Sequence, residues 1–194
     1  IEESKKNLFT ASPVAYENFI IAPFSNGDLV SFIYDEGRPI WSENVSKASL
    51  ISNFALKDIA ASPVIAGTEI ISLSSHGKII SVNIINGQRN WSVDISGYRT
   101  PIVSGNQIYL IDEDGRLICL DRTSGDIYWI SNLGKFRKGN KIDDLNMWLG
   151  PYLLNNLLYT VSYFGDLKII SPINGEIVSQ RNVGINKIII DPII

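Results

Sequence analysis

The stretch "CLDRTSGDIYW", from Cys119 to Trp129, decides the fold of this 194-residue chain. Asp121 ends an apolar run, a glycine follows it by four residues, and the tryptophan follows the glycine by four more. A second copy, "SVNIINGQRNW", ends at Trp91, and a weaker copy, "SFIYDEGRPIW", ends at Trp41. A motif that returns at constant spacing indicates an internal repeat.

Four copies of this repeat align on a proline that follows a small residue. A first glycine follows the proline by 14 residues, a second glycine by 24, and the tryptophan position by 28. The prolines are Pro13, Pro63, Pro101 and Pro151, the first glycines are Gly27, Gly77, Gly115 and Gly165, and the second glycines are Gly37, Gly87, Gly125 and Gly175. The tryptophan position holds Trp41, Trp91, Trp129 and, in the fourth copy, Ser179. Because the spacing is the same in all four copies, with no insertion, chance is a poor explanation for the repeat.

Each copy has the composition of four short β-strands separated by tight turns. β-Branched and aromatic residues fill the strands, and the first glycine supplies the positive φ angle that a tight hairpin turn requires. Four short strands in a repeat of about 40 to 50 residues are typical of a propeller blade. We therefore predict an all-β propeller of four-stranded antiparallel blades with tryptophan-docking motifs.

The repeat also sets the expected domain organisation. We predict one propeller domain over residues 1–194, with blades at about 12–45, 62–95, 100–133 and 150–183. Residues 184–194 begin a further blade, so that about four blades are present out of a propeller of about eight. An open propeller exposes blade faces and strand edges, which favours pairing with a second copy or with the missing half.

The repeated residues themselves have an expected structural role. We predict that Trp41, Trp91 and Trp129 dock between neighbouring blades, where each covers a large apolar area. The second glycines turn the outer hairpins. Cys119, the only cysteine, occupies the place of Ser31 and Ser81, and a small inward residue there predicts a buried and inert thiol.

Charge and composition exclude several classes of function. The net charge is −3 and the pI is about 5.2, which argues against the basic stripe of a nucleic-acid surface. No apolar run approaches the roughly 18 residues that span a bilayer. One cysteine excludes both an internal disulfide and a zinc site of the CxxC kind.

A search for an active site leads to no candidate. The one histidine, His76, precedes Gly77 in a hairpin turn, where a turn residue is a better interpretation than a catalytic base. Asp143 and Asp144 form a pair in a long loop and are better explained as solvated than as catalytic. We therefore predict no catalytic residue, no bound cofactor and no metal site, and thus a protein that is not an enzyme.

The connections between blades are where the copies differ. The gap from tryptophan to the next proline is 22, 10 and 22 residues, so residues 42–62 and 130–150 contain long loops. In an up-and-down blade both emerge on the face of the first-glycine turns, which makes a plausible recognition surface. In the second loop, Arg137 and Lys138 precede Asp143 and Asp144. Such a charge-segregated loop can steer a partner, and it can equally be solvated filler.

The docking motif resembles that of the quinoprotein dehydrogenase superfamily, whose propellers consist of PQQ-like repeats. Within that superfamily, three segments resemble the outer-membrane β-barrel assembly lipoproteins of the BamB family, in their α-proteobacterial form. They are "LKDIAASPVIAG" at 56–67, residues 95–133 and residues 147–178. The resemblance implies a non-enzymatic scaffold of the periplasm, at the inner face of the outer membrane, that is anchored only by a lipidated cysteine upstream of Ile1. It also implies that inter-blade loops bind a POTRA domain of the central barrel-assembly subunit.

The family's partner-binding residues carry over at one position. The family has an aspartate five residues before the second Ser-Pro, and here that residue is Asp58, with Leu56 and Lys57 beside it. The family's next aspartate is Ala60 here, and "SKKNLF" at 4–9 matches the family's other contact poorly. Asp58 can also simply cap or solvate a loop. Two other functions remain open, a different protein-binding propeller and a fragment of a PQQ-dependent dehydrogenase.

Overall fold

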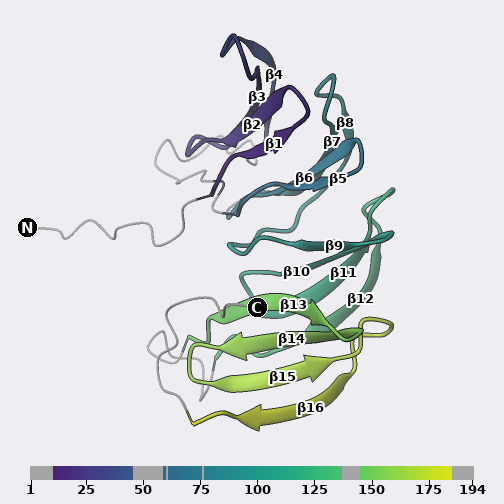
Figure 1. Ribbon diagram of the computed structural model, residues 1–194. Coiled ribbons are helices and arrows are strands. Elements are labelled where there is room, and N and C mark those ends of the chain that lie inside the picture. Colours follow the sequence, from purple (N-terminus) through teal and green to yellow (C-terminus); the bar gives the residue numbers. More distant parts are fainter. Residues whose placement is uncertain (1–10, 46–58, 60, 76, 137–144, 185–194) are drawn as a thin grey trace, which may run out of the picture.

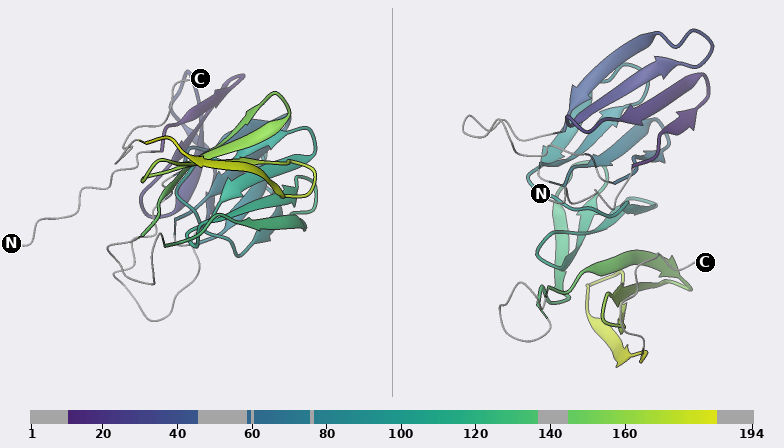
Figure 2. Two further views of the ribbon diagram at one scale, coloured as in Figure 1. Left: turned by 90° about the horizontal axis from the view of Figure 1, so that it is seen from below. Right: turned by 90° about the vertical axis from the view of Figure 1, so that its left-hand side faces the viewer.

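The computed structural model describes residues 11–45, 59, 61–75, 77–136 and 145–184. These residues form 16 strands in four separate antiparallel sheets of four strands each (Figure 1). Within each sheet the strands follow one another in chain order, as in an up-and-down blade. The predicted all-β fold is therefore confirmed, and the blades form an open arc (Figure 2).

The strands of the four blades have the following bounds. Blade 1 contains β1 (Val14–Tyr16), β2 (Phe19–Pro23), β3 (Asp28–Ile33) and β4 (Pro39–Asn44). Blade 2 contains β5 (Val64–Ala66), β6 (Glu69–Leu73), β7 (Ile79–Asn83) and β8 (Arg89–Val93). Blade 3 contains β9 (Ile102–Ser104), β10 (Gln107–Ile111), β11 (Arg116–Asp121) and β12 (Ile127–Asn132). Blade 4 contains β13 (Trp148–Leu154), β14 (Leu157–Ser162), β15 (Asp166–Ile170) and β16 (Ile177–Asn182).

The first strand of each blade lies next to the first strand of the following blade. β1 contacts β5, β5 contacts β9, and β9 contacts β13, so these strands form the inner wall of the arc. β13 begins at Trp148, three residues before Pro151, whereas the first strands of the other blades begin one residue after their proline. It is longer than the other first strands because Trp148 and Leu149 pair with the far end of β14.

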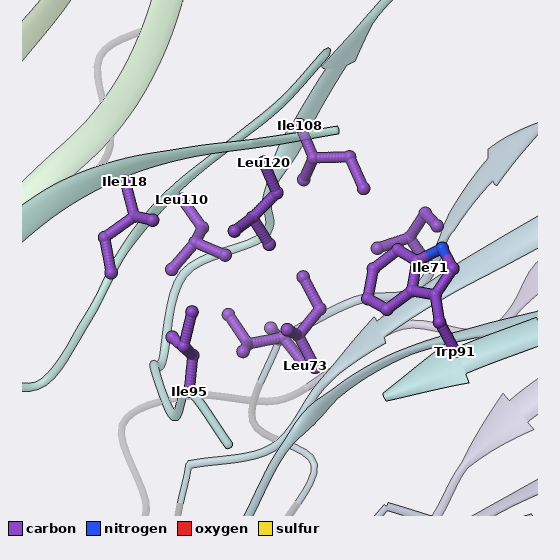
Figure 3. Packing of buried hydrophobic residues seen from close by; sticks show 10 residues of the cluster. Ile71, Leu73, Trp91, Ile95, Ile108, Leu110, Ile118 and Leu120 are labelled. Atoms are coloured by element: carbon purple, nitrogen blue, oxygen red, sulfur yellow. The ribbon is translucent and has the colours of Figure 1, made fainter. Parts of the chain in front are cut away.

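One apolar cluster lies between each pair of adjacent blades. In β10, Ile108 and Leu110 pack against blade 2, whereas the alternate residues Tyr109 and Ile111 pack against blade 4. Both faces of a middle blade are therefore buried, which explains why its strands are nearly continuous runs of apolar residues. Figure 3 shows the cluster between blades 2 and 3, in which Trp91 closes one end.

Candidate functional site

The two faces of the propeller carry different kinds of connection. We call one the docking face, because it holds the turns with the second glycines. The other is the connection face, because it holds the first-glycine turns and the links between blades. Three backbone bonds tie blade ends to these turns: Val45 N donates to Gly27 O, Leu133 N to Gly115 O, and Val183 N to Gly165 O, all at 2.8–2.9 Å. Both long loops thus begin on the connection face.

The docking face repeats one contact at each blade boundary. The indole nitrogen of each docking tryptophan donates to a backbone carbonyl of the next blade, just before the second glycine. Trp41 Nε1 donates to Ile84 O at 3.0 Å, Trp91 Nε1 to Arg122 O at 2.7 Å, and Trp129 Nε1 to Pro172 O at 3.0 Å. The ring packs between the blades and its one polar atom is satisfied there, as a buried indole requires.

The second glycine of each following blade lies directly against that indole ring. A Cβ atom on Gly87 would lie 2.5 Å from Cγ of Trp41, which is closer than two non-bonded carbon atoms can approach. The same approach recurs at Gly125 against Trp91 and at Gly175 against Trp129, where the added Cβ would lie 2.8 and 2.5 Å from Cε3. Gly37 has nothing within 4 Å of such a Cβ, because no described blade precedes its own.

A small residue is the cross-strand partner of each tryptophan. Ser31 pairs with Trp41, Ser81 with Trp91, and Cys119 with Trp129, and in each case the strand register shifts immediately afterwards. Cys119 is completely buried. Burial, with a smaller contribution from the charge of Asp121, raises the pKa of its thiol to about 12. A thiol of this kind is a poor nucleophile.

Asp121 organises the turn that positions the docking glycine of blade 3. Its Oδ1 accepts hydrogen bonds from the backbone nitrogens of Thr123 and Ser124 at 2.7 and 2.9 Å. The hydroxyl groups of Thr123 and Tyr128 also donate to this carboxylate. These bonds, those from the two hydroxyls first, hold the pKa of Asp121 well below its usual range. The residue therefore acts as an acceptor that closes a turn.

The connection face carries a cluster of charges at the turn between β10 and β11. Asp112, only 6% exposed, accepts bonds from the backbone nitrogens of Asp114 and Arg116 at 3.0 and 2.8 Å. Its other oxygen accepts Nε of Arg116 at 2.6 Å. Asp114 accepts Nζ of Lys135 at 2.6 Å, and this contact lowers the pKa of Asp114. The turn is thus fixed to the end of the same blade.

The candidate loop residues from the sequence lie outside the described residues: Leu56, Lys57, Asp58, Arg137, Lys138, Asp143 and Asp144. His76 lies outside them too. The structure does describe both ends of each loop. Phe136 forms a β-bridge with Leu145, and Asn146 N donates to Lys135 O at 2.7 Å. Val45 and Ile59, which flank residues 46–58, are buried in one cluster.

The sequence matches a known protein family. Residues 2–131 match the family model described as outer membrane protein assembly factor BamB. The chain belongs to this family. The match covers three of the four blades and confirms the family resemblance that the repeat indicated. No curated protein matches the sequence.

Solved structures of this family and of other propellers resemble the chain. BamB from Moraxella catarrhalis superposes with a TM-score of 0.75 at 16% identity, over 90% of this chain and 50% of that one. A quinohemoprotein alcohol dehydrogenase from Pseudomonas putida HK5 superposes with a TM-score of 0.69 at 11% identity, over 88% of this chain and 34% of that one. The C-terminal WD40 domain of Sif2 superposes with a TM-score of 0.63 at 19% identity, over 89% of this chain and 45% of that one. At these identities the likeness shows the fold alone, and this BamB-family chain spans about half the length of the BamB structure.

The structure of this BamB-family chain adds Trp148 to the residues that sequence reasoning found. Trp148 is 5% exposed and donates from Nε1 to Gly134 O at 2.8 Å. The Nζ atom of Lys168 lies over its ring, 5.3 Å from the ring centroid. Lys168 Nζ also donates to Leu133 O at 2.9 Å, and burial lowers the pKa of this lysine. A groove of about 410 Å³ opens beside these residues. The signal in the sequence was a fourth tryptophan outside the 28-residue spacing.

Two further observations concern only the part of the chain that the structure describes. Within these ranges, no group of three or more histidine, cysteine, aspartate or glutamate side chains is arranged to hold a metal ion. None of these residues belongs to a helix that is long and apolar enough to cross a membrane.

Proposed function

We propose that this chain is a non-enzymatic scaffold in the assembly of outer-membrane β-barrel proteins. The observation that carries the proposal is the family match over residues 2–131, whose description names an outer membrane protein assembly factor. The proposed partner is a POTRA domain of the central barrel-assembly subunit. The proposed location is the periplasm, at the inner face of the outer membrane, with a lipid anchor upstream.

The connection face is the proposed partner-binding surface. Functional residues concentrate on loops that a rigid scaffold holds, and the two long loops both begin on this face. Their ends are fixed, because the bridge between Phe136 and Leu145 closes one and the buried pair Val45 and Ile59 flanks the other. We assign partner contacts to Leu56, Lys57 and Asp58 in the first loop and to Arg137, Lys138, Asp143 and Asp144 in the second.

Further blades are proposed to cover the open side of blade 4. Tyr159 and Leu167 occupy the places that Tyr109 and Leu117 hold in blade 3, where blade 4 buries both almost completely. On blade 4 itself both side chains are only half-buried, although the apolar pattern is unchanged. An uncovered apolar face of this kind indicates a contact surface. The remaining half of a propeller of about eight blades fits it, and a second copy of this chain is the alternative, which light scattering that gives a monomer of 21.5 kDa would exclude.

The experiment that tests the function is a binding titration against the POTRA domains of the same organism's barrel-assembly subunit, at two salt concentrations. We expect saturable binding that weakens with salt if the charged loops contribute. Asp58→Arg should weaken binding about tenfold or more. The substitution replaces a negative charge that is complementary to the proposed partner surface by a positive charge that the surface would repel. Glu176→Arg, an exposed change on the docking face, is the matched control and should bind as the unchanged protein does. Absence of binding at both salt concentrations would contradict the proposal.

A fragment of a PQQ-dependent dehydrogenase is the second candidate, because quinohemoprotein alcohol dehydrogenases share the fold. Titration with the quinone and calcium separates the two functions. A dehydrogenase fragment should change the quinone absorbance on binding, whereas a scaffold should not. If the chain binds neither the quinone nor the POTRA domains, a propeller with another protein partner is the remaining function.

A further inference from the structure

The outer strand of blade 3, β12, is an edge strand. The strand order in its sheet is β12-β11-β10-β9, so no described strand pairs with the outer side of β12 (Figure 1). An edge of this kind presents a row of N–H and C=O groups to which another extended chain can add, and proteins usually protect it with charged side chains or proline. The presence or absence of this protection therefore decides whether an outer strand can bind another strand.

The other three outer strands contain a protecting residue, and β12 does not. β4 contains Pro39 and Glu43, β8 contains Arg89, and β16 contains Arg181. Arg89 also reaches β4, where its Nη2 atom donates to Asn44 O at 3.0 Å and pairs with Glu43. β12 consists of Ile-Tyr-Trp-Ile-Ser-Asn, with no proline and no charge. All four strands share a register shift beside the tryptophan position, so this irregularity does not protect β12 in particular.

The backbone of β12 directs hydrogen-bonding groups outward at two defined residues. Leu133 N donates to Gly115 O at 2.9 Å, and opposite pairs in an antiparallel ladder alternate between bonded and non-bonded. Asn132 and Ile130 stand one and three residues before Leu133, so both occupy non-bonded positions of the register with β11. Their N–H and C=O groups therefore point away from β11, to the side where the sheet ends.

The side chains of β12 are apolar where the other outer strands are polar. Ile130 is 48% exposed, and Ile127 is 47% exposed. The residues that correspond to Ile130 in the other blades are Ser42, Ser92 and Gln180. Ile127 and Ile130 both lie opposite β11 residues of the cluster between blades 2 and 3, so the two side chains share the face toward blade 2. This pair favours apolar side chains in a strand that adds to β12.

The other face of β12 borders a groove at the docking-face end of the strand. The groove has a volume of about 740 Å³ and lies between Tyr128 and Trp129 of β12 and Ile173 of blade 4. None of the described residues that line it is charged, and Tyr128 and Ile173 are 53% and 79% exposed. Both long loops begin on the connection face, at the other end of β12. A strand added to β12 directs alternate side chains to this side, where the groove has room for an aromatic ring.

We propose that β12 binds an extended segment of a partner polypeptide as a fifth strand of blade 3. The backbone of the segment bonds to the N–H and C=O groups of Ile130 and Asn132. Every second side chain of the segment is apolar and lies beside Ile127 and Ile130, and an aromatic side chain of the other set enters the groove at Tyr128.

The chemistry of the strand restricts the occupant to such a segment. A row of backbone donors and acceptors is complemented by another extended backbone, and the side chains beside it select the sequence. The segment is uncharged along the contact, because β12 has no charge to pair with. The site goes beyond the proposed function, because it lies at the docking-face end of β12, whereas the POTRA partner is proposed to bind the connection face.

The direct test is an NMR titration of the ¹⁵N-labelled chain with a synthetic peptide of about eight residues, a usual strand length. The peptide alternates valine with threonine, has phenylalanine in place of one central threonine, and carries lysine only at its two ends. We expect saturable shifts of the backbone amide signals of Ile130 and Asn132. Hydrogen exchange at these amides should slow at least about tenfold, because their N–H groups then donate to the peptide. The amide of Ser92, at the place of Ile130 in β8, should stay unchanged.

A backbone-modified peptide separates strand addition from apolar adhesion. N-methyl groups on the central residues remove the N–H donors and hinder pairing, while all side chains stay the same. This peptide should bind at least about tenfold more weakly, because strand addition depends on backbone hydrogen bonds. Equal binding of the two peptides would overturn the proposal, since side chains alone would then account for the contact.

Two matched variants connect the binding to β12. Ile130→Lys introduces the protecting charge that β12 lacks and should weaken peptide binding about tenfold or more. Ser92→Lys introduces the same side chain at the same place of β8 and should have no effect, and the spectra report whether each variant is folded. Unchanged binding by Ile130→Lys, equal weakening by Ser92→Lys, or no binding to the unchanged chain would each overturn the proposal. Ile130→Lys should leave POTRA binding unchanged, so this proposal and the proposed function can fail separately.

Discussion

The docking face and the connection face are built on the same four sheets, yet they differ in how far the blades repeat one another. On the docking face, the contact of Trp41 with Ile84 and Gly87 recurs at the next two blade boundaries with nearly the same distances. On the connection face, the corresponding turns hold different side chains. Asp112 closes the turn of blade 3, whereas Ser162 closes the turn of blade 4 by accepting Asp166 N at 2.9 Å.

This difference separates the contacts that hold the blades together in the arc from the side chains that distinguish one blade from another. A contact that recurs at every boundary stabilises stacking and carries no information about a partner. The long loops occur at two of the three boundaries, where the connections differ in length. We therefore expect substitutions at the tryptophan contacts of the docking face to change stability, and substitutions in the long loops of the connection face to change partner binding.

The largest expected effect is the loss of a docking tryptophan. Trp91 is 9% exposed, fills the cluster between blades 2 and 3, and bonds Arg122 O. Trp91→Ala should lower the free energy of unfolding by about 3–5 kcal/mol, measured by urea denaturation. Tyr34→Ala removes an aromatic ring that is 68% exposed and should change it by less than about 0.5 kcal/mol. Equal effects of the two changes would contradict the structural role of the dock.

A smaller effect is expected at the second glycines, and it isolates the tryptophan contact. Gly37 and Gly87 have similar positive φ angles of 64° and 73°, but only Gly87 lies against an indole ring. Gly37→Ala should therefore cost about 1 kcal/mol for the backbone alone. Gly87→Ala should cost about 3 kcal/mol, because the overlap with Trp41 is added. Thermal or urea unfolding of the pair measures the difference, and equal costs would mean that the ring yields freely.

Stability effects smaller than that of Gly87→Ala are expected at the charged turn of the connection face. Asp112→Ala removes the acceptor of two backbone nitrogens and the partner of Arg116, and should cost about 2 kcal/mol. Asp112→Ser introduces the side chain that closes the same turn in blade 4, and should recover about half of that loss. Asp114→Ala, at an exposed salt bridge with Lys135, should cost less than about 1 kcal/mol. Urea denaturation of the three variants tests this order, and recovery by serine is the outcome that would show the two turns to be interchangeable.

The sequence predicted the fold well because the deciding signals are local. The 14-, 24- and 28-residue spacings predicted four blades, and the four sheets have the strand order that those spacings require. The greater length of β13 was not evident from the repeat, because Trp148, which donates to Gly134 O, extends the strand. The candidate site was less predictable. Asp58, Arg137 and the other loop residues were selected by family resemblance or charge, and they stay predictions.

The sequence by itself determined the blades, the tryptophans and the glycines between them, because a turn, a strand period and a fixed spacing are written in consecutive residues. Only the tertiary structure decided which buried polar atoms have no hydrogen-bond partner among the described residues, as is the case for Glu113 Oε1 and Asn146 Oδ1. Glu113 and Asn146 are 33 residues apart, and neither differs in the sequence from any other solvated side chain. Whether an acceptor is buried and finds a donor depends on how three blades meet, which no local pattern encodes.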